Sequence, residues 1–270
     1  MKIDRERALG AFREYVDGYH TETEKVRLKI EHTYRVAELS EKIALSLGMS
    51  KEDVDLAWLV GLLHDIGRFE QLKNYGTFLD ADSIDHARYG AEILFGQGKI
   101  RDFTEDGEED GLIRTAVASH NAYRISDGLE ERTERFCHMI RDADKIDILR
   151  VNVEFPLEEI YNVDSASLRG SQVTEEVMES FRGEHAVLRS LKKTAVDHVV
   201  GHISLVYELV YPASLKLVEE QGYLDKLMRF RSENPVTEGQ FAEIRHKMGR
   251  YMEDRKRMPQ GSYDLRTVNG

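Results

Sequence analysis

The chain contains a single cysteine, Cys137, among its 270 residues. One thiol excludes an internal disulfide framework and a zinc site built from several cysteines. Cys137 stands between apolar residues in ERFCHMIRDADKI, which predicts a buried structural thiol and no nucleophile. This cysteine usage fits a reducing compartment, so the expected location is the cytoplasm.

Prolines are few, four in total, and no long Gly- or Ser-rich stretch interrupts the chain. A flexible string of domains is therefore disfavoured. Long apolar runs are also missing, since the stretch 203–210 is too short to cross a bilayer and carries a charge. The opening MKIDRERALGAFREYV lacks the continuous apolar segment of a secretory signal. We therefore expect neither a membrane span nor export.

Positive charge is in deficit, because 50 acidic residues face 38 basic ones and leave a net charge of -12. This balance disfavours nucleic acid and anionic membranes as partners. An acidic surface can still hold a local cationic centre, and a bound metal ion would supply one. The content of 41% hydrophobic and 33% charged residues is ordinary for a soluble globular protein.

Helical periodicity dominates what is present. Apolar residues recur at three- and four-residue intervals over 36–47 and 56–63, with Gly48 ending one helix and Ser50 beginning the next. Further helices are expected at 112–122 and 130–149, a polar loop near 164–173, and a loose tail over the last residues, 258–270. The prediction is an all-α protein, a helical bundle over 1–150 with a helical extension over 151–270 packed on it.

Six polar residues stand on apolar-flanked helical segments, most of them about 20–35 residues apart: His32, His64, Asp65, His86, His120 and Asp144. Such gaps suit one ligand per helix around a site in the core of a bundle. Imidazoles and carboxylates without thiolates are ligands of zinc, iron and manganese, and three or four of them leave coordination positions open for catalysis. Neighbouring helical residues project about 100° apart, so the carboxylate beside a ligand histidine can bridge to a second metal.

The order His, His-Asp, His, His, Asp resembles the six-ligand form of the HD-domain superfamily of metal-dependent phosphohydrolases. The strings HDIGRF and DADKI are similar to its motifs, and the resemblance covers roughly residues 20–150. It implies an HD-type bundle holding two divalent transition metal ions (iron, manganese, zinc, cobalt or nickel), with magnesium also open. The implied ligands form two sets that share one carboxylate: His32, His64, Asp65 and Asp144, and Asp65, His86 and His120.

The same resemblance implies that a metal-activated water hydrolyses a phosphomonoester or phosphodiester of a nucleotide or similar small metabolite. Asp65 would bridge the ions, and Arg68 matches a position where similar proteins carry a basic residue that meets phosphate. Lys145 is a second candidate for that role, while a surface arginine is an equally good explanation of Arg68. Glu70 or Asp147 could orient a ligand histidine. The sequence has no GxSxG, P-loop or convincing Cys/His pair, which disfavours a covalent nucleophile.

Alternatives stay open for single residues. His32 could lie on a polar helix face, His86 could start a helix and His120 could end one. Asp144 has two acidic neighbours that could replace it: Asp142 and Asp147. The pair His198 and His202 has the spacing of a metal clip but no third ligand nearby, which favours a packed or exposed helix face.

Alternatives stay open for the function as well. The same ligand set serves HD-type di-iron oxygenases, and a metal-stabilised module could bind a nucleotide or a protein without catalysis. Five leucines of the extension fit either a homo-oligomer interface or packing within the chain: Leu205, Leu209, Leu215, Leu217 and Leu224.

Overall fold

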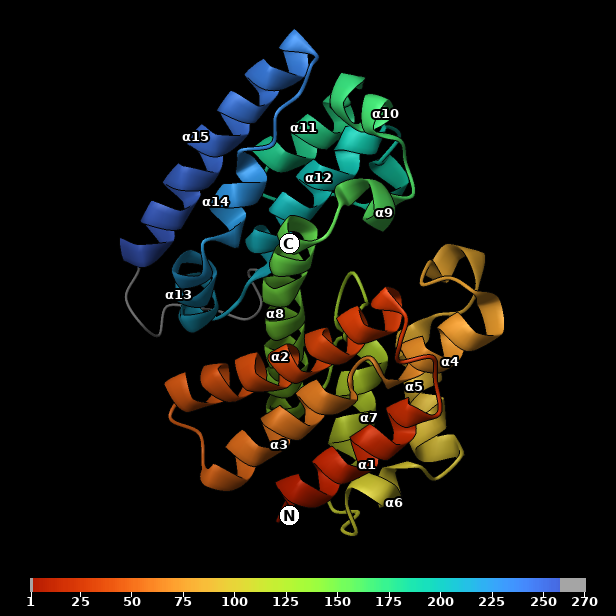
Figure 1. Cartoon of the computed structure of the whole chain (residues 1–270). Coiled ribbons are helices and arrows are strands. Elements are labelled where there is room, and N and C mark those ends of the chain that lie inside the picture. Colours follow the sequence, from red (N-terminus) through yellow and green to blue (C-terminus); the bar gives the residue numbers. More distant parts are fainter. Residues whose placement is uncertain (1, 258–270) are drawn as a thin grey trace. The chain divides into compact units, whose positions relative to one another are not determined.

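The computed structural model describes residues 2–257 and contains helices, turns and loops but no strand among them (Figure 1). The predicted all-α class is confirmed. Within this range no helix combines the length and apolar composition that crossing a membrane requires. The predicted loose tail at 258–270 lies outside the described residues.

Contacts divide the chain into two compact units, one ending at Asp144 and the other beginning at Lys145. The division falls inside helix α8, whereas the sequence suggested a boundary near residue 150. The first unit contains these elements: α1 (Arg5–Asp17), α2 (Glu24–Ser46), α3 (Lys51–Leu63), α4 (Ile66–Tyr75), η1 (Asp80–Asp82), α5 (His86–Ala91), η2 (Glu92–Gly96), α6 (Ile100–Phe103), α7 (Asp110–Ser119) and the first part of α8 (Glu131–Glu154).

Helices α2 and α3 form the main packed pair of the first unit (Figure 1). Their apolar rows are buried, as in Ile43 and Leu59, neither of which is exposed to solvent. At Gly61 the two backbones approach so closely that a Cβ would lie 2.6 Å from Cα of Ala37. The absence of a side chain at Gly61 therefore allows the short distance between α2 and α3 at this point.

The turn between α2 and α3 follows the predicted capping signals. Gly48 has a φ of 64°, the left-handed conformation that favours glycine after a helix. The side chain of Ser50 accepts a hydrogen bond from the backbone N–H of Asp53 and caps α3. Leu47, which the periodicity placed in the apolar row, follows the last helical residue and is 38% exposed. The row therefore ends with the helix itself.

A second close approach joins α4 to α5. A Cβ on Gly67 would lie 2.3 Å from the carbonyl oxygen of His86 and 2.6 Å from the backbone nitrogen of Gly90. Only glycine permits this backbone-to-backbone contact. The glycine of HDIG thus brings the start of α5 against the start of α4.

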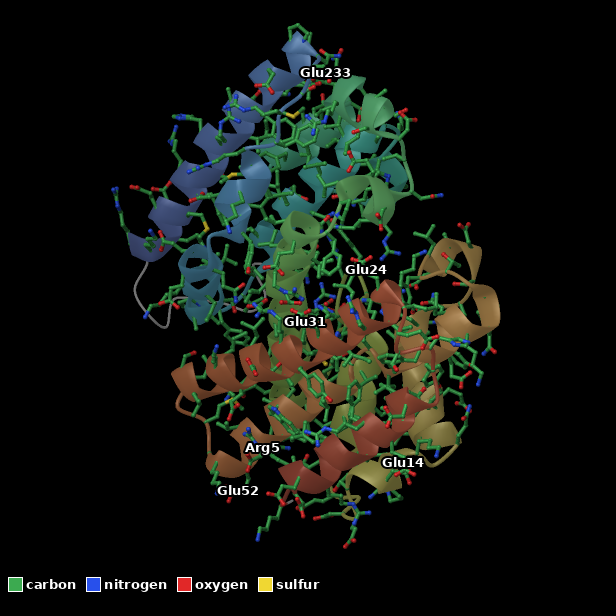
Figure 2. The ribbon with its side chains drawn as sticks, in the orientation of Figure 1. Arg5, Glu14, Glu24, Glu31, Glu52 and Glu233 are labelled. Atoms are coloured by element: carbon green, nitrogen blue, oxygen red, sulfur yellow. The ribbon has the colours of Figure 1, made fainter. Side chains whose placement is uncertain are left out.

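Charged side chains cover the outside of this unit, as Figure 2 shows for Glu14 and Glu52. Arg5 is tied into the helices instead, because its guanidinium donates to Asp55 over 2.8 Å and to Glu41 over 2.7 Å. These contacts join α1 to α2 and α3. Partly exposed pairs of this kind add little stability individually and mainly fix orientation.

The second unit continues α8 and adds these elements: α9 (Leu157–Tyr161), α10 (Ser165–Gly170), α11 (Glu175–Arg182), η3 (Arg189–Leu191), α12 (Ala195–Ile203), η4 (Ser204–Glu208), α13 (Pro212–Gln221), α14 (Tyr223–Met228) and α15 (Pro235–Arg257). The polar loop expected near 164–173 is wrong in part. Asp164 accepts from the backbone N–H of Ser167 and caps α10 there. Polar composition concealed a short, capped helix.

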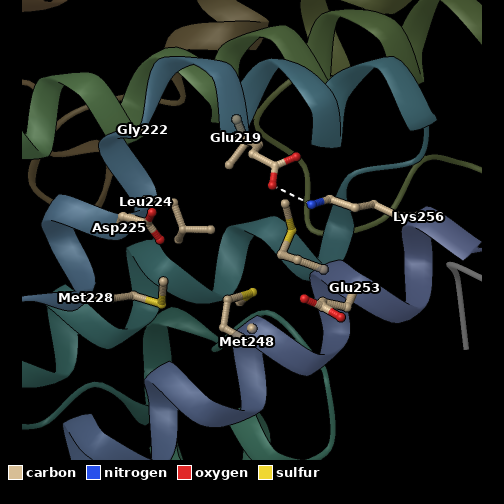
Figure 3. A pocket seen from close by; sticks show the side chains of 11 residues that line it. Glu219, Gly222, Leu224, Asp225, Met228, Met248, Glu253 and Lys256 are labelled. Atoms are coloured by element: carbon tan, nitrogen blue, oxygen red, sulfur yellow. Dashed lines mark hydrogen bonds and ion pairs between the residues drawn. The ribbon is translucent and has the colours of Figure 1, made fainter.

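A small pocket of about 180 Å³ lies among α13, α14 and α15 (Figure 3). Leu224, Met228 and Met248 line it, and the ion pair between Glu219 and Lys256 stands at its edge. Its lining belongs to the second unit alone. It holds none of the residues predicted for the metal site.

Candidate metal centre

His64 and Asp65 occupy the junction between α3 and α4, where one helix ends and the next begins. His64 follows the last residue of α3, and its Nδ1 lies 2.7 Å from the carbonyl oxygen of Gly61. A carbonyl only accepts, so Nδ1 carries the hydrogen and Nε2 presents a lone pair. Asp65 precedes α4 without capping it through its side chain, which leaves the carboxylate for other partners.

His120 repeats this arrangement at the end of α7. It follows the last residue of that helix, and its Nδ1 lies 2.8 Å from the carbonyl oxygen of Val117. In both cases the imidazole satisfies a carbonyl that the helix end leaves without a partner. The same bond fixes the tautomer and aims Nε2 away from the helix.

His86 is the first residue of α5, so the expectation that it could start a helix is correct. The same ring also takes part in the cluster. Its Nδ1 lies 2.7 and 2.9 Å from the two carboxylate oxygens of Asp80, which turns Nε2 inward. Sequence reasoning missed Asp80. The acidic run DADSID before His86 was the available signal, since carboxylates commonly orient ligand histidines.

His32 lies within α2 and Asp144 within α8, and both reach the same cluster. His32 Nε2 is 3.1 Å from an Asp144 oxygen and 3.3 Å from His64 Nε2. That Asp144 oxygen lies 3.8 Å from His64 Nε2. The carboxylate of Asp144 itself, rather than only that of a neighbour, therefore approaches the two rings.

Asp65 stands at the centre, and its two oxygens face different partners. Oδ2 lies 3.6 Å from His64 Nε2 and 3.7 Å from His32 Nε2. Oδ1 lies 3.4 Å from His86 Nε2 and 3.6 Å from His120 Nε2. The structure thus brings all six predicted side chains together, in two groups on either side of one carboxylate.

The donor set fits a bound cation. His86 Nε2 and His120 Nε2 are 3.0 Å apart, although both rings use Nδ1 as the hydrogen-bearing nitrogen. Two facing lone pairs at this distance repel unless a proton or a metal ion lies between them. Burial lowers the pKa of His64 to about 3 and that of His86 to about 4, so both rings stay neutral near pH 7. Neutral imidazole is the metal-binding form.

Two groups of potential ligand atoms, each within 4.8 Å, come from this cluster: His32, His64 and Asp144, and His64, Asp65 and His120. A third group consists of Asp80, Asp85 and His86. Hydrogen bonds account for that third group, because Asp80 holds His86 and Asp85 accepts from the first backbone N–H groups of α5. The cluster around Asp65 is therefore the candidate metal centre.

Lys29 is a further residue that sequence reasoning missed. Its ammonium lies 2.8 Å from Asp65 Oδ2. Burial alone would raise the pKa of Asp65, but Lys29 and the surrounding basic groups hold it well below its usual range. Lys29 lies one helical turn before His32, so the shared face of α2 was the available signal.

The structure ties Arg68 to Asp80. Its Nη1 donates to Asp80 Oδ1 over 2.8 Å and to the Phe78 carbonyl over 2.5 Å, while Nε is buried without a hydrogen-bond partner. The guanidinium therefore supports the carboxylate that orients His86. A phosphate contact of Arg68 stays a prediction.

The remaining predicted residues have other partners. Lys145 Nζ lies 3.0 Å from Glu208, and its catalytic role stays a prediction. Glu70 accepts from Tyr19 over 2.7 Å, and Asp147 pairs with Arg150 over 2.8 Å. Asp80 performs the orienting role that the sequence suggested for Glu70 or Asp147.

Comparison with known proteins finds a family match that covers most of the first unit. Residues 30–149 match the model of the HD domain, and all six clustered residues lie inside this range. This part of the chain is an HD domain. The predicted superfamily is thereby confirmed, and the fold of an HD domain is all-α, as observed. HD domains are generally hydrolases that bind divalent metals, and the clustered imidazoles and carboxylates are suited to such ions.

Two curated relatives are similar to a larger part of the chain. Ribonuclease Y of Oceanobacillus iheyensis is 28% identical over 179 residues, covering 62% of this chain and 28% of that protein. Ribonuclease Y of Acetivibrio thermocellus is 27% identical over 154 residues, covering 57% of this chain and 23% of that protein. The match thus spans about a quarter of the length of each relative. No solved structure matches the chain significantly.

Proposed function

We propose that the HD domain holds two divalent metal ions bridged by Asp65 and hydrolyses a phosphate ester of a nucleotide or similar small metabolite. The observation that carries this proposal is the division of the cluster by Asp65. Each oxygen of one buried carboxylate faces its own pair of imidazole nitrogens, within 3.4–3.7 Å. A carboxylate that serves two ions is typical of binuclear hydrolytic sites.

The residues divide between the two ions as follows: His32, His64, Asp65 and Asp144 for the first, and Asp65, His86 and His120 for the second. Ions held there would lower the pKa of water and offset the negative charge of the phosphoryl oxygens. The protein's own contribution is orientation. The carbonyls of Gly61 and Val117 and the carboxylate of Asp80 each fix a ring with Nε2 inward.

Lys29 and Arg68 supply fixed positive charge beside the centre. Lys29 contacts Asp65, and its ammonium can turn to a phosphoryl oxygen once metal ions satisfy that carboxylate. Arg68 is held by Asp80, the carboxylate that orients His86. We propose Lys29 as a phosphate contact beside the sequence candidates Arg68 and Lys145.

The test is metal analysis combined with single ligand variants. Protein loaded with manganese, iron or cobalt should bind two ions per chain and hydrolyse phosphate esters. Asp144→Ala should remove one ion, His120→Ala the other, and Asp65→Ala both. His64→Ala should lower hydrolysis by at least about 1000-fold, since the Lewis acid is lost. His246→Ala, an exposed histidine on α15, is the matched control and should change neither property.

Several outcomes would contradict the proposal. Less than one ion per chain, with no hydrolysis after reconstitution, would remove the metal-dependent reaction. Oxygen consumption by the iron-loaded protein with a polyol or phosphonate, without hydrolysis, would instead indicate di-iron oxygen chemistry. Ligand binding that His64→Ala leaves untouched, without turnover, would indicate a binding module.

RNA is a second candidate substrate, and the observation that favours it is the name of both relatives, Ribonuclease Y. The net charge of -12 argues against broad electrostatic binding of RNA. A monoester, a diester, nucleoside monophosphates and a short RNA should therefore be compared under one loading condition. Cleavage of RNA faster than the small esters would favour the second candidate, and the reverse order the first.

A further inference from the structure

The second unit contains a group of basic side chains, which we call the basic cluster: Arg189, Lys192, His198 and His202. Arg189 lies in η3, Lys192 directly follows it, and both histidines lie on α12. Neither Arg189 nor Lys192 forms an ion pair with any residue in the described range 2–257. Nearby basic residues differ, since Lys193 pairs with Glu176 and Arg182 with Glu243. Each of these two basic residues therefore keeps its charge without an acidic partner in that range, although the chain has a net charge of -12.

The position of Lys192 depends on Gly201. A Cβ on Gly201 would lie 2.4 Å from Lys192 Cε and 2.5 Å from Nζ. The lysine chain therefore lies across α12 at the turn that carries both histidines, in space that only glycine leaves open. Lys192 is partly buried there.

Tyr161 fixes the ring of His202. Its hydroxyl donates to Asn152 Oδ1 over 2.6 Å, because the Asn152 amide nitrogen is used on the Ile148 carbonyl. The contact of 2.8 Å between the hydroxyl and His202 Nδ1 is therefore donated by the histidine. His202 Nε2 is left with the lone pair. Tyr161 also stacks on His202 with ring centroids 5.5 Å apart and on His198 with centroids 5.2 Å apart.

The carboxylate that acts on Lys192 is that of Asp197, and hydrogen bonds to other groups already occupy it. Its oxygens accept from the backbone N–H groups of Thr174, Lys193 and Thr194, each over 2.9 Å. It also accepts from the Thr174 hydroxyl over 3.1 Å. Asp197 is fully buried and caps α12, so it cannot turn toward the basic cluster.

The electrostatic consequence is a region in which the charge of Asp197 opposes the positive charges of Lys192 and Arg189 in part. Burial lowers the pKa of Lys192 to about 8, and the charge of Arg189 adds to that effect. Burial, followed by the charge of Lys192, also lowers the pKa of His198 and His202. An anion in this place would offset the cost of burying the ammonium of Lys192.

We propose that the basic cluster binds the phosphate group of a small metabolite. Lys192 and Arg189 would donate to separate oxygens, and His202 would donate from Nε2 after taking up a proton. Donors on three separate side chains suit an oxyanion with several oxygens and two charges better than a carboxylate. The inference is independent of the metal centre, whose residues all lie before Lys145.

The test is calorimetric titration of inorganic phosphate into full-length His64→Ala protein in the presence of a chelator, so that no metal competes. We expect one phosphate per chain. Lys192→Met should weaken binding by at least about tenfold, the usual loss for a charged hydrogen bond. Lys192→Arg should bind within a few-fold of the parent. Lys193→Met, on the adjacent lysine that pairs with Glu176, is the matched control and should bind like the parent.

Arg189→Gln provides a second variant, on an exposed residue whose loss does not threaten folding. It should also weaken binding by about tenfold. The nitrogen NMR signal of His202 Nε2 should shift to the protonated position on phosphate addition. Pyrophosphate and nucleoside 5′-monophosphates complete the series, since tighter binding of a monophosphate identifies a phosphorylated metabolite and weaker binding identifies free phosphate as the ligand.

Absence of binding at 20 mM phosphate would overturn the proposal, because this concentration is on the order of 1000 times the dissociation constant expected of a three-donor site. So would equal binding by the parent, Lys192→Met and Arg189→Gln. These failures leave metal content and hydrolysis by the wild-type protein untouched, so they are distinguishable from a failure of the proposed function.

Discussion

The two units of the chain each gather four or more titratable side chains, and the two sets have opposite electrostatic requirements. Around Asp65, neutral imidazoles turn Nε2 lone pairs inward beside two carboxylates, Asp65 and Asp144. Around Lys192, an ammonium and a guanidinium stand beside two histidines without a free acid. The first set suits a metal cation and the second an anion.

The net charge of the whole chain therefore does not predict which ions either cluster can bind. The net charge of -12 is a sum over all acidic and basic residues of the chain. What each cluster can bind depends on the hydrogen bonds that nearby backbone and side-chain groups form with its carboxylates. Asp80 is used to orient a metal-type ligand ring, whereas Asp197 is used to cap a helix. Local hydrogen bonding therefore decides the sign of each site.

The largest effect on the cluster around Asp65 is expected from Gly67→Ala, which displaces His86 but leaves every clustered side chain unchanged. The new methyl group would meet the His86 carbonyl oxygen and the Gly90 nitrogen, so α5 must move away from α4. We expect the free energy of unfolding to fall by about 3 kcal/mol and one metal ion per chain to be lost. Denaturant unfolding and metal analysis measure both. Gly10→Ala, where nothing lies within 4 Å of the new group, should instead stabilise α1 slightly.

A weaker effect is expected from Asp80→Asn, which keeps the shape but removes the charge behind His86. The amide accepts a weaker bond from Nδ1, so affinity for the second ion should fall by about 10–100-fold. Metal titration of wild type and variant measures this loss. Asp82→Asn changes an exposed residue of the same short helix and serves as control. Equal loss in both variants would show that Asp80 acts only through general charge.

The six side chains that the sequence grouped lie close together in the structure, and local sequence signals explain why they could be singled out. His64 and Asp65 directly follow a buried apolar helix, and both His64 and His120 stand at the C-terminal cap of a helix. The all-α class and the start of α3 at Ser50 also follow from local rules. Whether the six clustered residues bind metal stays a prediction until ions are measured.

The missed residues share a different property. Asp80 reaches His86 only because the chain turns back through a short helix, and Lys29 matters only because α2 lies against the α3–α4 junction. In the second unit, His202 meets Tyr161 from 41 positions away. Such contacts depend on tertiary packing, which periodicity and spacing do not encode. The basic cluster was therefore visible only as an isolated histidine pair.

The role of Lys29 can be separated from that of the metal by Lys29→Met. In chelated protein the variant leaves Asp65 buried without its ammonium partner, and the free energy of unfolding should fall by about 2 kcal/mol. Saturating metal should shrink this difference, because ions then satisfy the same carboxylate. Lys25→Met, an exposed lysine one turn earlier on α2, should have no effect in either state. An equal loss with and without metal would mean that Lys29 stabilises α2 by packing alone.

The smallest effect is expected for Lys192→Met, in the pH dependence of its free energy of unfolding relative to the wild type. The pKa of Lys192 is about 8 in the folded protein, against about 10.4 in the unfolded chain. Below pH 8 both states hold the proton, so the wild type bears the full cost of the buried charge. The variant should then be more stable by about 1 kcal/mol.

Between pH 8 and about 10.4 the unfolded chain holds more protons than the folded protein, so wild-type stability gains on the variant and the difference falls toward zero. The charged or titratable groups around Lys192 are Arg189, Asp197, His198 and His202, all of which the variant retains. Denaturant unfolding of both proteins in chelator at pH 7, 8, 9 and 10 measures the difference. Phosphate at pH 7 should reverse its sign, because the anion stabilises only the protein that keeps the ammonium. A difference independent of both pH and phosphate would leave packing as the whole role of Lys192.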